Sequence, residues 1–381
     1  MVIYPEIVTE ILRLSENNLQ PFYLYQTKVI QDNCKVFNQI SYPERAVHFA
    51  SMANANPDFL KIIKDEKINI FVNSPLHLKA ALNAGFRAKE IIYTASGLSQ
   101  EIMQLIGKLD LQVNIDSLNQ LLLWSKLFPA KQVGIRCNIG DAVKPYSSHA
   151  GAFIGKESRL GFTNEDLKQI PDKSIINGLH LYAGTDITDI DYMISCYEQL
   201  ANLAMDFPAI EYLNFGGGFA LNESGEHNFD FDTYSKKVSE LMEKVSAQKG
   251  KRIKMILEPG RMVGGNAGYF VCSVTDIKNR SERTLVGVNA STVQFSRPLL
   301  YPDEARHPIS IIRNGKQLTD FKTQNTTVFG CSTYSRDIFA HNVQLPELQL
   351  NDIVIFENAG SYCASSYMQF LGFPKPEEYF I

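Results

Sequence analysis

Short apolar runs alternate with longer amphipathic stretches through the first two thirds of the chain. Each run has roughly the length of a buried strand, and most of the stretches between runs are long enough for a helix. The predicted strands are 46–51, 68–72, 90–94, 111–116, 132–137, 176–182, 211–215 and 254–258. The helix-like stretches include 58–66, 76–85, 99–108, 117–127, 187–206 and 231–248. This alternation predicts a (β/α)8 barrel, and a doubly wound open sheet is the competing arrangement.

The pattern changes from about residue 266, where short β-like runs follow one another without a long helical stretch. These runs are 269–277, 284–289, 309–313, 326–329 and 352–357. A short helix and a strand at 22–25 are predicted near the N-terminus. The chain is therefore predicted to combine an α/β barrel with a second, mostly β domain.

Composition narrows the function classes. The 381 residues carry 45% apolar side chains and a net charge of −4, which gives no electrostatic reason to propose a nucleic acid or a membrane as partner. The N-terminus has early acids, Glu6 and Glu10, and no basic segment, so no signal peptide is expected. The six cysteines are scattered without a CxxC pair. We therefore expect reduced thiols, a cytoplasmic location and no metal site.

Candidate chemistry follows the predicted strand ends, where barrels place their binding groups. Gly216-Gly217-Gly218 follows the seventh strand, and its backbone can approach an anion closely, although an ordinary flexible turn has the same composition. Glu258 and Arg261 follow the eighth strand, where an acid and a base so close together also fit a structural ion pair. His180 ends the sixth strand and, alone, fits a packed core histidine equally well.

The end of the first predicted strand carries a specific resemblance. Phe49-Ala50-Ser51-Met52-Ala53-Asn54 is similar to the phrase Tyr-Ala-Val-Lys-Ala-Asn of the ornithine and diaminopimelate decarboxylases, the fold-type III pyridoxal-phosphate (PLP) enzymes. In that family the lysine forms the Schiff base with the cofactor, and Met52 stands at its position. Asp58, ahead of the next apolar run, is expected to cap a helix.

Other phrases continue the resemblance in the family's order. Glu258-Pro259-Gly260-Arg261 matches the family's Glu-Pro-Gly-Arg, and Ala359-Gly360-Ser361-Tyr362 resembles its Ala-Gly-Ala-Tyr. Gly178 to Thr185 resembles Gly-Leu-His-x-His-x-Gly-Ser, with Tyr182 in place of the second histidine. Weaker matches are Asp116-Ser117, Arg136, Asn138 and Ser158 to Phe162.

The resemblance implies a domain plan and a set of cofactor contacts. Residues 1–28 would join the β domain, 29–265 would form the PLP-binding barrel, and 266–381 would form the β domain. Glu258 would face the pyridine nitrogen of PLP, and His180 would stack on its ring. The residues implied to bind the phosphate are Gly217, Gly218, Gly260 and Tyr362, and Arg261 is also implied to bind the cofactor.

Substrate contacts and assembly are also implied. Arg297 and Tyr301 match an Arg-Pro-x-x-Tyr that helps to hold substrate. The partner subunit of a homodimer would contribute the segment 330–337, in which Thr333 replaces a catalytic cysteine, Tyr334 replaces the acid that reads a distal amine, and Asp337 is kept. Because Arg336 adds positive charge, we predict a substrate with a distal carboxylate or a conjugated side chain, as in siderophore biosynthesis. The alternative is that Arg336 points to solvent or pairs with a structural acid.

Three functions stay open at this point. The leading one is a PLP-dependent amino-acid decarboxylase, and the others are a non-catalytic relative that binds a ligand or partner and an amino-acid racemase. Met52 is either an introduced substitution of the lysine or a native feature of a divergent branch. Departures around the same site, at Ser51, Tyr182, Thr333 and Tyr334, favour divergence.

Overall fold

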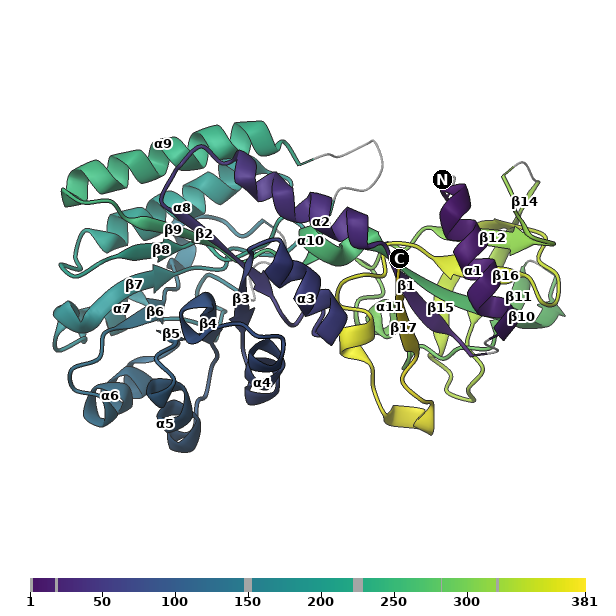
Figure 1. Ribbon diagram of the computed structural model, residues 1–381, viewed down its shortest axis with the longest axis horizontal. Helices are drawn as coiled ribbons and strands as arrows, with labels where there is room; N and C mark the ends of the chain where they lie inside the picture. Colours follow the sequence, from purple (N-terminus) through teal and green to yellow (C-terminus); the bar gives the residue numbers. More distant parts are fainter. Residues whose placement is uncertain (1–2, 18–19, 147–152, 222–228, 282, 320–321) are drawn as a thin grey trace. The chain divides into compact units, whose positions relative to one another are not determined.

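The computed structural model describes residues 3–17, 20–146, 153–221, 229–281, 283–319 and 322–381. The chain divides into two compact units, one of residues Ile30–Val263 and one of Met1–Val29 with Gly264–Ile381. We call them the barrel unit and the β unit, and Figure 1 shows the elements of each.

The barrel unit is a closed barrel of parallel strands. Its strands are β2 (Arg45–Ala50), β3 (Asn69–Val72), β4 (Ile91–Thr94), β5 (Gln112–Ile115), β6 (Val133–Arg136), β7 (Ile176–His180), β8 (Tyr212–Asn214) and β9 (Lys254–Leu257). The last strand pairs with the first, with Val47 opposite Leu257. This closing pair confirms the predicted (β/α)8 barrel and rules out the open sheet.

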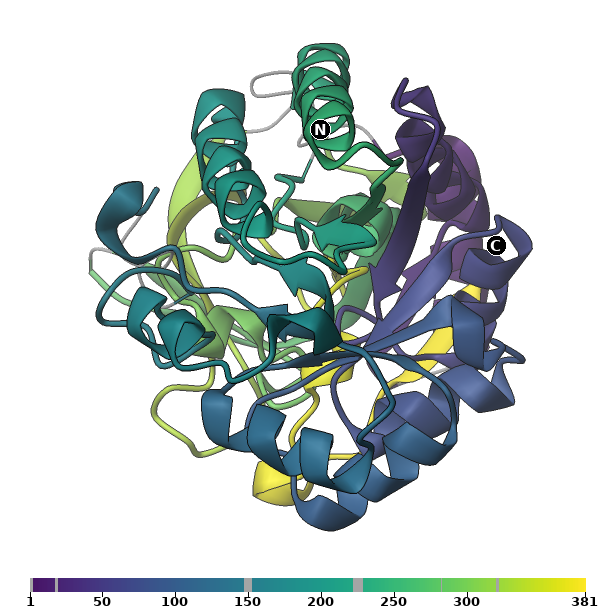
Figure 2. The ribbon, with the colours of Figure 1, turned by 90° about the vertical axis from the view of Figure 1, so that its left-hand side faces the viewer.

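Helices form the outer ring of the barrel unit, as Figure 2 shows. They are α2 (Thr27–Val36), which begins in the β unit, then α3 (Pro57–Asp65), α4 (Pro75–Asn83), α5 (Gln100–Lys108), α6 (Leu118–Leu127), α7 (Asn164–Lys168), α8 (Ile190–Ala204) and α9 (Phe231–Lys249). Their inward side chains are buried apolar groups, so the strands are covered on their outer face.

The start of α3 corrects one expectation. Asn56, not Asp58, caps the helix, because its side-chain oxygen accepts hydrogen bonds from the backbone N–H groups of Asp58 and Phe59. Pro57 occupies the first helical position, where its missing N–H is not needed. The cap fixes the chain directly after the turn that contains Met52.

The β unit contains a nine-stranded sheet with the central order β13-β12-β16-β10-β11-β14-β15, and β1 joins β10 and β17 at its side. The strands are β1 (Phe22–Tyr25), β10 (Gly268–Asn279), β11 (Thr284–Val288), β12 (Ile309–Arg313), β13 (Lys316–Gln317), β14 (Thr323–Phe329), β15 (Ile338–Pro346), β16 (Ile353–Phe356) and β17 (Glu377–Phe380). The mostly β domain is thus confirmed, and β13, β15 and β17 are strands that sequence reasoning missed.

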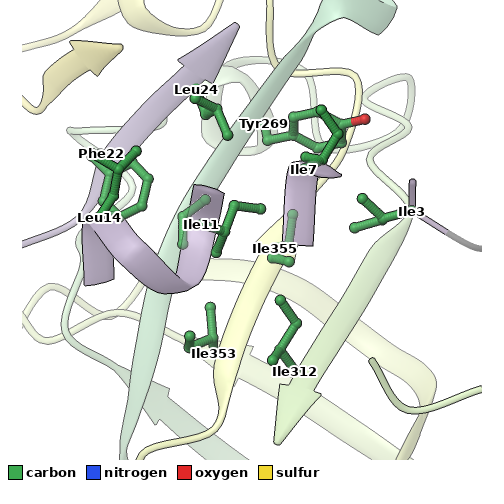
Figure 3. Packing of buried hydrophobic residues seen from close by; sticks show 11 residues of the cluster. Ile3, Ile7, Ile11, Leu14, Phe22, Leu24, Tyr269, Ile312, Ile353 and Ile355 are labelled. Carbon is green, nitrogen blue, oxygen red and sulfur yellow. The ribbon is translucent and has the colours of Figure 1, made fainter. Parts of the chain in front are cut away.

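Helix α1 (Pro5–Asn17) covers one face of this sheet (Figure 3). Ile7, Ile11 and Leu14 recur on one side of the helix and are buried against residues of four strands. Those sheet residues are Phe22, Leu24, Tyr269, Val271, Ile312, Ile353 and Ile355. The N-terminal segment therefore belongs to the β unit through an apolar core rather than through the strand pairing of β1 alone.

Candidate functional site

A polar cluster fills the end of the barrel where β7, β8 and β9 finish. His180 is the last residue of β7, Asn214 is the last of β8, and Glu258 directly follows β9. All three side chains are buried. Asn214 Nδ2 donates to Glu258 Oε1 at 2.7 Å, and His180 Nε2 lies 3.3 Å from Glu258 Oε2. Each carboxylate oxygen therefore has a partner, while His180 Nδ1 is buried without one among the described residues.

Electrostatics keep the Glu258 carboxyl ionised. Burial acts to raise its pKa, but the charge of His180 and the hydrogen bonds from His180 and Asn214 outweigh burial and hold the pKa below its ordinary value. Burial lowers the pKa of His48, on β2, to about 4, so that neighbouring ring is neutral at pH 7.

Arg136 brings a second charge to the same end of the barrel. It ends β6, and its Nε and Nη2 atoms are buried without a hydrogen-bond partner in the described part of the chain. Burial lowers the pKa of its guanidinium, while the charges of Asp116 and Glu258 act in the opposite direction. An arginine stays protonated in proteins, so this guanidinium can receive an anionic group.

The polar cluster rests on a hydrogen-bonded layer inside the barrel. Tyr212 donates from its hydroxyl to Asn114 Oδ1 at 2.8 Å, and Asn114 Nδ2 donates to Thr94 Oγ1 at 2.8 Å. Gly134 and Gly178 leave room for the tyrosine ring, because a Cβ at either position would lie within about 2 Å of it. The polar cluster therefore lies above a buried tyrosine that is linked by hydrogen bonds to Asn114 and Thr94.

The glycine loop after β8 packs too closely for side chains. A Cβ on Gly217 would lie 2.4 Å from the carbonyl oxygen of Glu258, and one on Gly218 would lie 2.4 Å from the carbonyl oxygen of Gly184. Gly216 and Gly218 also have positive φ angles, of 65° and 95°. The glycines are thus required by the fold here, which an ordinary flexible turn would not need, and the loop stays close to Glu258.

Arg261 corrects the idea of an ion pair with Glu258. Its Nε lies 2.7 Å from Asp186 Oδ1, while Glu258 is held by His180 and Asn214 instead. Asp186 lies in the loop after β7, and the next residue, Ile187, forms a backbone hydrogen bond with Gly218. Arg261 and Asp186 are therefore linked to the glycine loop. Gly260 is buried immediately before Arg261.

Met52 lies in the turn at residues 51–53 that follows β2, and its side chain is half-buried. The neighbouring Ser51 hydroxyl is buried without a hydrogen-bond partner among the described residues. The position that resembles the family's lysine thus carries a thioether at a barrel strand end. A thioether cannot form a Schiff base.

Asp337, in the β unit, is fully engaged by its own unit. Its carboxylate accepts hydrogen bonds from the Ser291 hydroxyl, from the backbone N–H and hydroxyl of Thr292, and from the backbone N–H of Ser332, at 2.6–3.1 Å. The side chain is only 2% exposed. In the described structure it organises the loop 330–337, and the predicted substrate contact stays a prediction.

The other predicted residues of the β unit differ in exposure. Arg297 is buried with its guanidinium 5.3 Å from the centre of the Tyr301 ring, and Tyr301 itself is 45% exposed. Thr333 and Arg336 are exposed, whereas Tyr334 is half-buried with its ring edge against Phe370, at 5.5 Å between centroids.

Tyr362 has a left-handed backbone with φ of 58°, which is unusual for a tyrosine. It follows β16 by six residues and is half-buried. Such strain collects at functional sites, which agrees with the role that the resemblance implies for this residue.

Two site residues were missed by sequence reasoning. Asn214 precedes the three glycines and forms hydrogen bonds with both Glu258 and Gly216. Asp186 forms an ion pair with Arg261. Their places at the ends of β8 and β7 were the available signal, because barrel sites are built from strand ends.

The barrel unit fits PLP in its chemistry, apart from Met52. Glu258 provides an ionised carboxylate for a pyridinium, the unpartnered Nδ1 of His180 provides a polar ring nitrogen, and the glycine loop excludes side chains. No cluster of three or more His, Cys, Asp or Glu side chains suited to a metal ion occurs in the described ranges. None of the described helices is long and apolar enough to cross a membrane.

Comparisons with known proteins agree with this chemistry. The family model described as pyridoxal-dependent decarboxylase, pyridoxal binding domain, matches residues 28–265. A diaminopimelate decarboxylase of Methanothermobacter thermautotrophicus is 28% identical in an alignment 389 residues long, which covers 96% of this chain and 88% of that protein. A crystal structure of a diaminopimelate decarboxylase has a TM-score of 0.90 at 22% identity and covers 98% of this chain and 91% of its own.

A structure of the diaminopimelate decarboxylase from Helicobacter pylori in complex with L-lysine has a TM-score of 0.83 at 23% identity, with 97% and 93% of the two chains covered. These structures share the fold along nearly the full chain. Together with the family model, which spans more than half of the residues, they place the chain in a family. The chain belongs to the fold-type III pyridoxal-phosphate-dependent decarboxylases.

Proposed function

We propose that this decarboxylase acts on an amino acid whose side chain ends in a carboxylate or in a conjugated, acylated group, of the kind used in siderophore biosynthesis. The observation that most supports this proposal is in the loop 330–337, where the half-buried Tyr334 presents an aromatic ring instead of an acid. Arg336 is exposed on the same loop, and no ion pair of its side chain occurs within the described residues. A neutral ring and a cation favour an anionic or bulky distal group over an ammonium.

The barrel residues have separate tasks. PLP, when bound, supplies the electron sink for the electron pair that is left when CO2 departs. Glu258 would hold the proton on the pyridine nitrogen, because its carboxyl is ionised and fixed at both oxygens. His180 would pack at the ring, and the glycine loop with Gly260 and Arg261 would hold the phosphate. Met52 has neither an amine nor a proton to give, so the proton that replaces the carboxylate comes from another group.

We also propose a C2 homodimer. The family resemblance assigns the loop 330–337 to the site of the partner subunit, so a monomer would lack Tyr334 and Arg336 at its own site. An isologous dimer supplies both sites at once. Sedimentation at micromolar concentration checks this. A strict monomer would contradict both the dimer and the proposed substrate class.

Met52 supports a second candidate, a PLP-fold protein that binds a ligand without turnover. The two candidates separate in a substrate panel assayed for CO2 release on the unaltered protein and on Met52→Lys. The panel compares ornithine, lysine and diaminopimelate with their carboxylate-bearing and acylated analogues. We expect the acidic or acylated compounds to react fastest. Faster release from ornithine or diaminopimelate than from every acidic analogue would refute the substrate proposal, and silence of both proteins would favour the binding protein.

The state of the cofactor gives an independent check. PLP held without a Schiff base is expected to absorb at roughly 390 nm and to leave on dialysis, whereas the Met52→Lys variant is expected to absorb at roughly 420 nm and to be reduced by borohydride. If the unaltered protein is reduced by borohydride without added amine, another lysine forms the Schiff base, and the assignment of Met52 is wrong.

A further inference from the structure

Asn214 joins the two halves of the cofactor site. Its Nδ2 donates to Glu258 Oε1 at 2.7 Å, while its Oδ1 accepts from the backbone N–H of Gly216 at 2.9 Å. The backbone of the same loop is tied to the same acid, since the N–H of Glu258 donates to the carbonyl of Gly216 at 2.7 Å. One fully buried amide thus links the carboxylate to the first residue of the glycine loop.

We propose that Asn214 is a positioning residue that keeps Glu258 ionised and aimed at the pyridine nitrogen while fixing the start of the glycine loop. The amide suits this task because it offers a donor to the acid and an acceptor to the loop, and both are used. The inference rests on the cofactor alone and is independent of the substrate.

The surroundings of Glu258 give the Asn214 amide a share in keeping the carboxylate ionised. His180 of β7 faces its other oxygen, at 3.3 Å. The guanidinium of Arg136 on β6 and the hydroxyl of Tyr212 on β8 also interact electrostatically with it, and His48 on β2 favours the ionised carboxylate only when its ring is protonated. Because His48 is neutral at pH 7, burial of the carboxylate is offset by His180 and by Asn214, whose 2.7 Å hydrogen bond is the shorter of the two contacts. Without it the carboxyl takes up a proton more readily.

The test uses Asn214→Leu, which keeps the volume and removes both amide contacts. The pKa of the Glu258 carboxyl is expected to rise, so a larger fraction is protonated as the pH falls and cannot hold the pyridinium. Relative to the unaltered protein, the affinity for PLP is expected to fall by about tenfold more at pH 6 than at pH 8. Equilibrium titration followed by PLP absorbance measures this without turnover.

Unfolding of the cofactor-free protein gives the second readout, with the opposite trend. In Asn214→Leu, the pKa of Glu258 in the folded state is expected to lie above its pKa in the unfolded state. Such a group contributes stability at low pH that is lost as the pH rises through the folded-state pKa. The loss of Tm caused by Asn214→Leu is therefore expected to grow from pH 5 to pH 8. A residue that only packs would lower Tm and affinity by the same amounts at every pH.

Two further variants make the outcome unambiguous. Asn177→Leu is the matched control, because Asn177 Nδ2 also donates to a glutamate, Glu211, at 3.3 Å, but at the surface. It is expected to change neither pH profile. In a Glu258→Gln background the pH dependence of Asn214→Leu is expected to vanish, since no acid remains to titrate. If Asn214→Leu does not fold, Asn214→Ser removes the same amide with a smaller side chain and serves the same measurements.

The proposal would be overturned if the pH profiles of PLP affinity and of Tm for Asn214→Leu ran parallel to those of the unaltered protein. A pH dependence that persists in the Glu258→Gln background would overturn it as well. Failure of the unaltered protein to bind PLP would instead count against the proposed function, and the unfolding profiles would still test the role of Asn214.

Discussion

Replacing Asp186 with asparagine is predicted to strengthen PLP binding while slightly lowering stability. Asp186 Oδ1 lies 2.7 Å from Arg261 Nε, and its loop is hydrogen-bonded to the glycine loop. With Arg261 at the phosphate, as proposed, the carboxylate competes with a bound phosphate for the same guanidinium. Its backbone is left-handed, with φ of 50°, which asparagine adopts readily. The substitution removes the charge and leaves the local conformation unstrained.

The magnitude follows from exposure. The Arg261 side chain is 12% exposed and that of Asp186 is 39% exposed, so solvent screens the pair and its loss costs about 0.5–1 kcal/mol of unfolding free energy. Removing this competing charge returns a similar amount to a phosphate contact at Arg261, which corresponds to about two- to fivefold tighter PLP binding. The gain should shrink in high salt, because part of the interaction is screened.

The assay is equilibrium titration with PLP and with pyridoxal, which lacks the phosphate. We expect Asp186→Asn to affect PLP alone. Asp191→Asn, which removes an exposed acid that pairs with Lys237, changes the net charge equally and serves as control. Equal changes for PLP and pyridoxal, or weaker PLP binding after Asp186→Asn, would refute the competition between carboxylate and phosphate.

Three further predictions concern stability. Gly217→Ala should cost at least about 1–3 kcal/mol and weaken PLP binding, since its Cβ would lie 2.4 Å from a backbone oxygen; Gly250→Ala, which meets no atom within 4 Å, should lower stability without affecting PLP. Asp337→Asn should lower stability by about 1–3 kcal/mol in chemical denaturation, because a buried carboxylate with four donors is replaced by an amide. Because the folded pKa of Glu258 is lowered, its contribution to stability is present above the unfolded pKa of about 4.3 and is lost as the pH falls further, and Glu258→Gln should flatten this acid limb of the Tm profile.

Periodicity was enough to locate the barrel strands, whereas an open sheet stayed the alternative until the pairing of β2 with β9 showed that the barrel closes. All eight strands form where apolar runs were recognised, because parallel strands are buried on both faces and read as continuous apolar segments. Strand β15 was missed for the opposite reason, since it carries exposed polar residues such as His341 and Asn342 and is recognised only by its pairing with β14. The cap of α3 was misplaced by two residues because Asn56 and Asp58 are both good caps, and only the position of Pro57 decides between them.

The site residues also fall into two groups, those that the sequence indicated and those that only the structure shows. The glycines, His180 and Glu258 lie in recognisable phrases, so the sequence indicated them. The contacts of Asn214 and Asp186 depend on which strand ends are neighbours and how far each side chain reaches, and neither property is written in a local pattern. Asp337 shows the reverse case, because the phrase is recognisable while its hydrogen bonds with Ser291 and Thr292 come from a distant segment.

The barrel end contains a buried carboxylate, which lowers folding stability and would have no use in a protein that served only as a scaffold. A buried carboxylate destabilises a fold unless hydrogen bonds and charges compensate for its lost hydration, and Glu258 uses Asn214 and His180 for this purpose. Apolar residues of the same volume would fill the barrel end with a more favourable folding free energy. A charge that is held ionised, with His180 Nδ1 left unpaired beside it among the described residues, is instead suited to a cationic ring nitrogen. Met52 offers no amine to a cofactor, so we predict that binding and covalent attachment of PLP are separable in this protein.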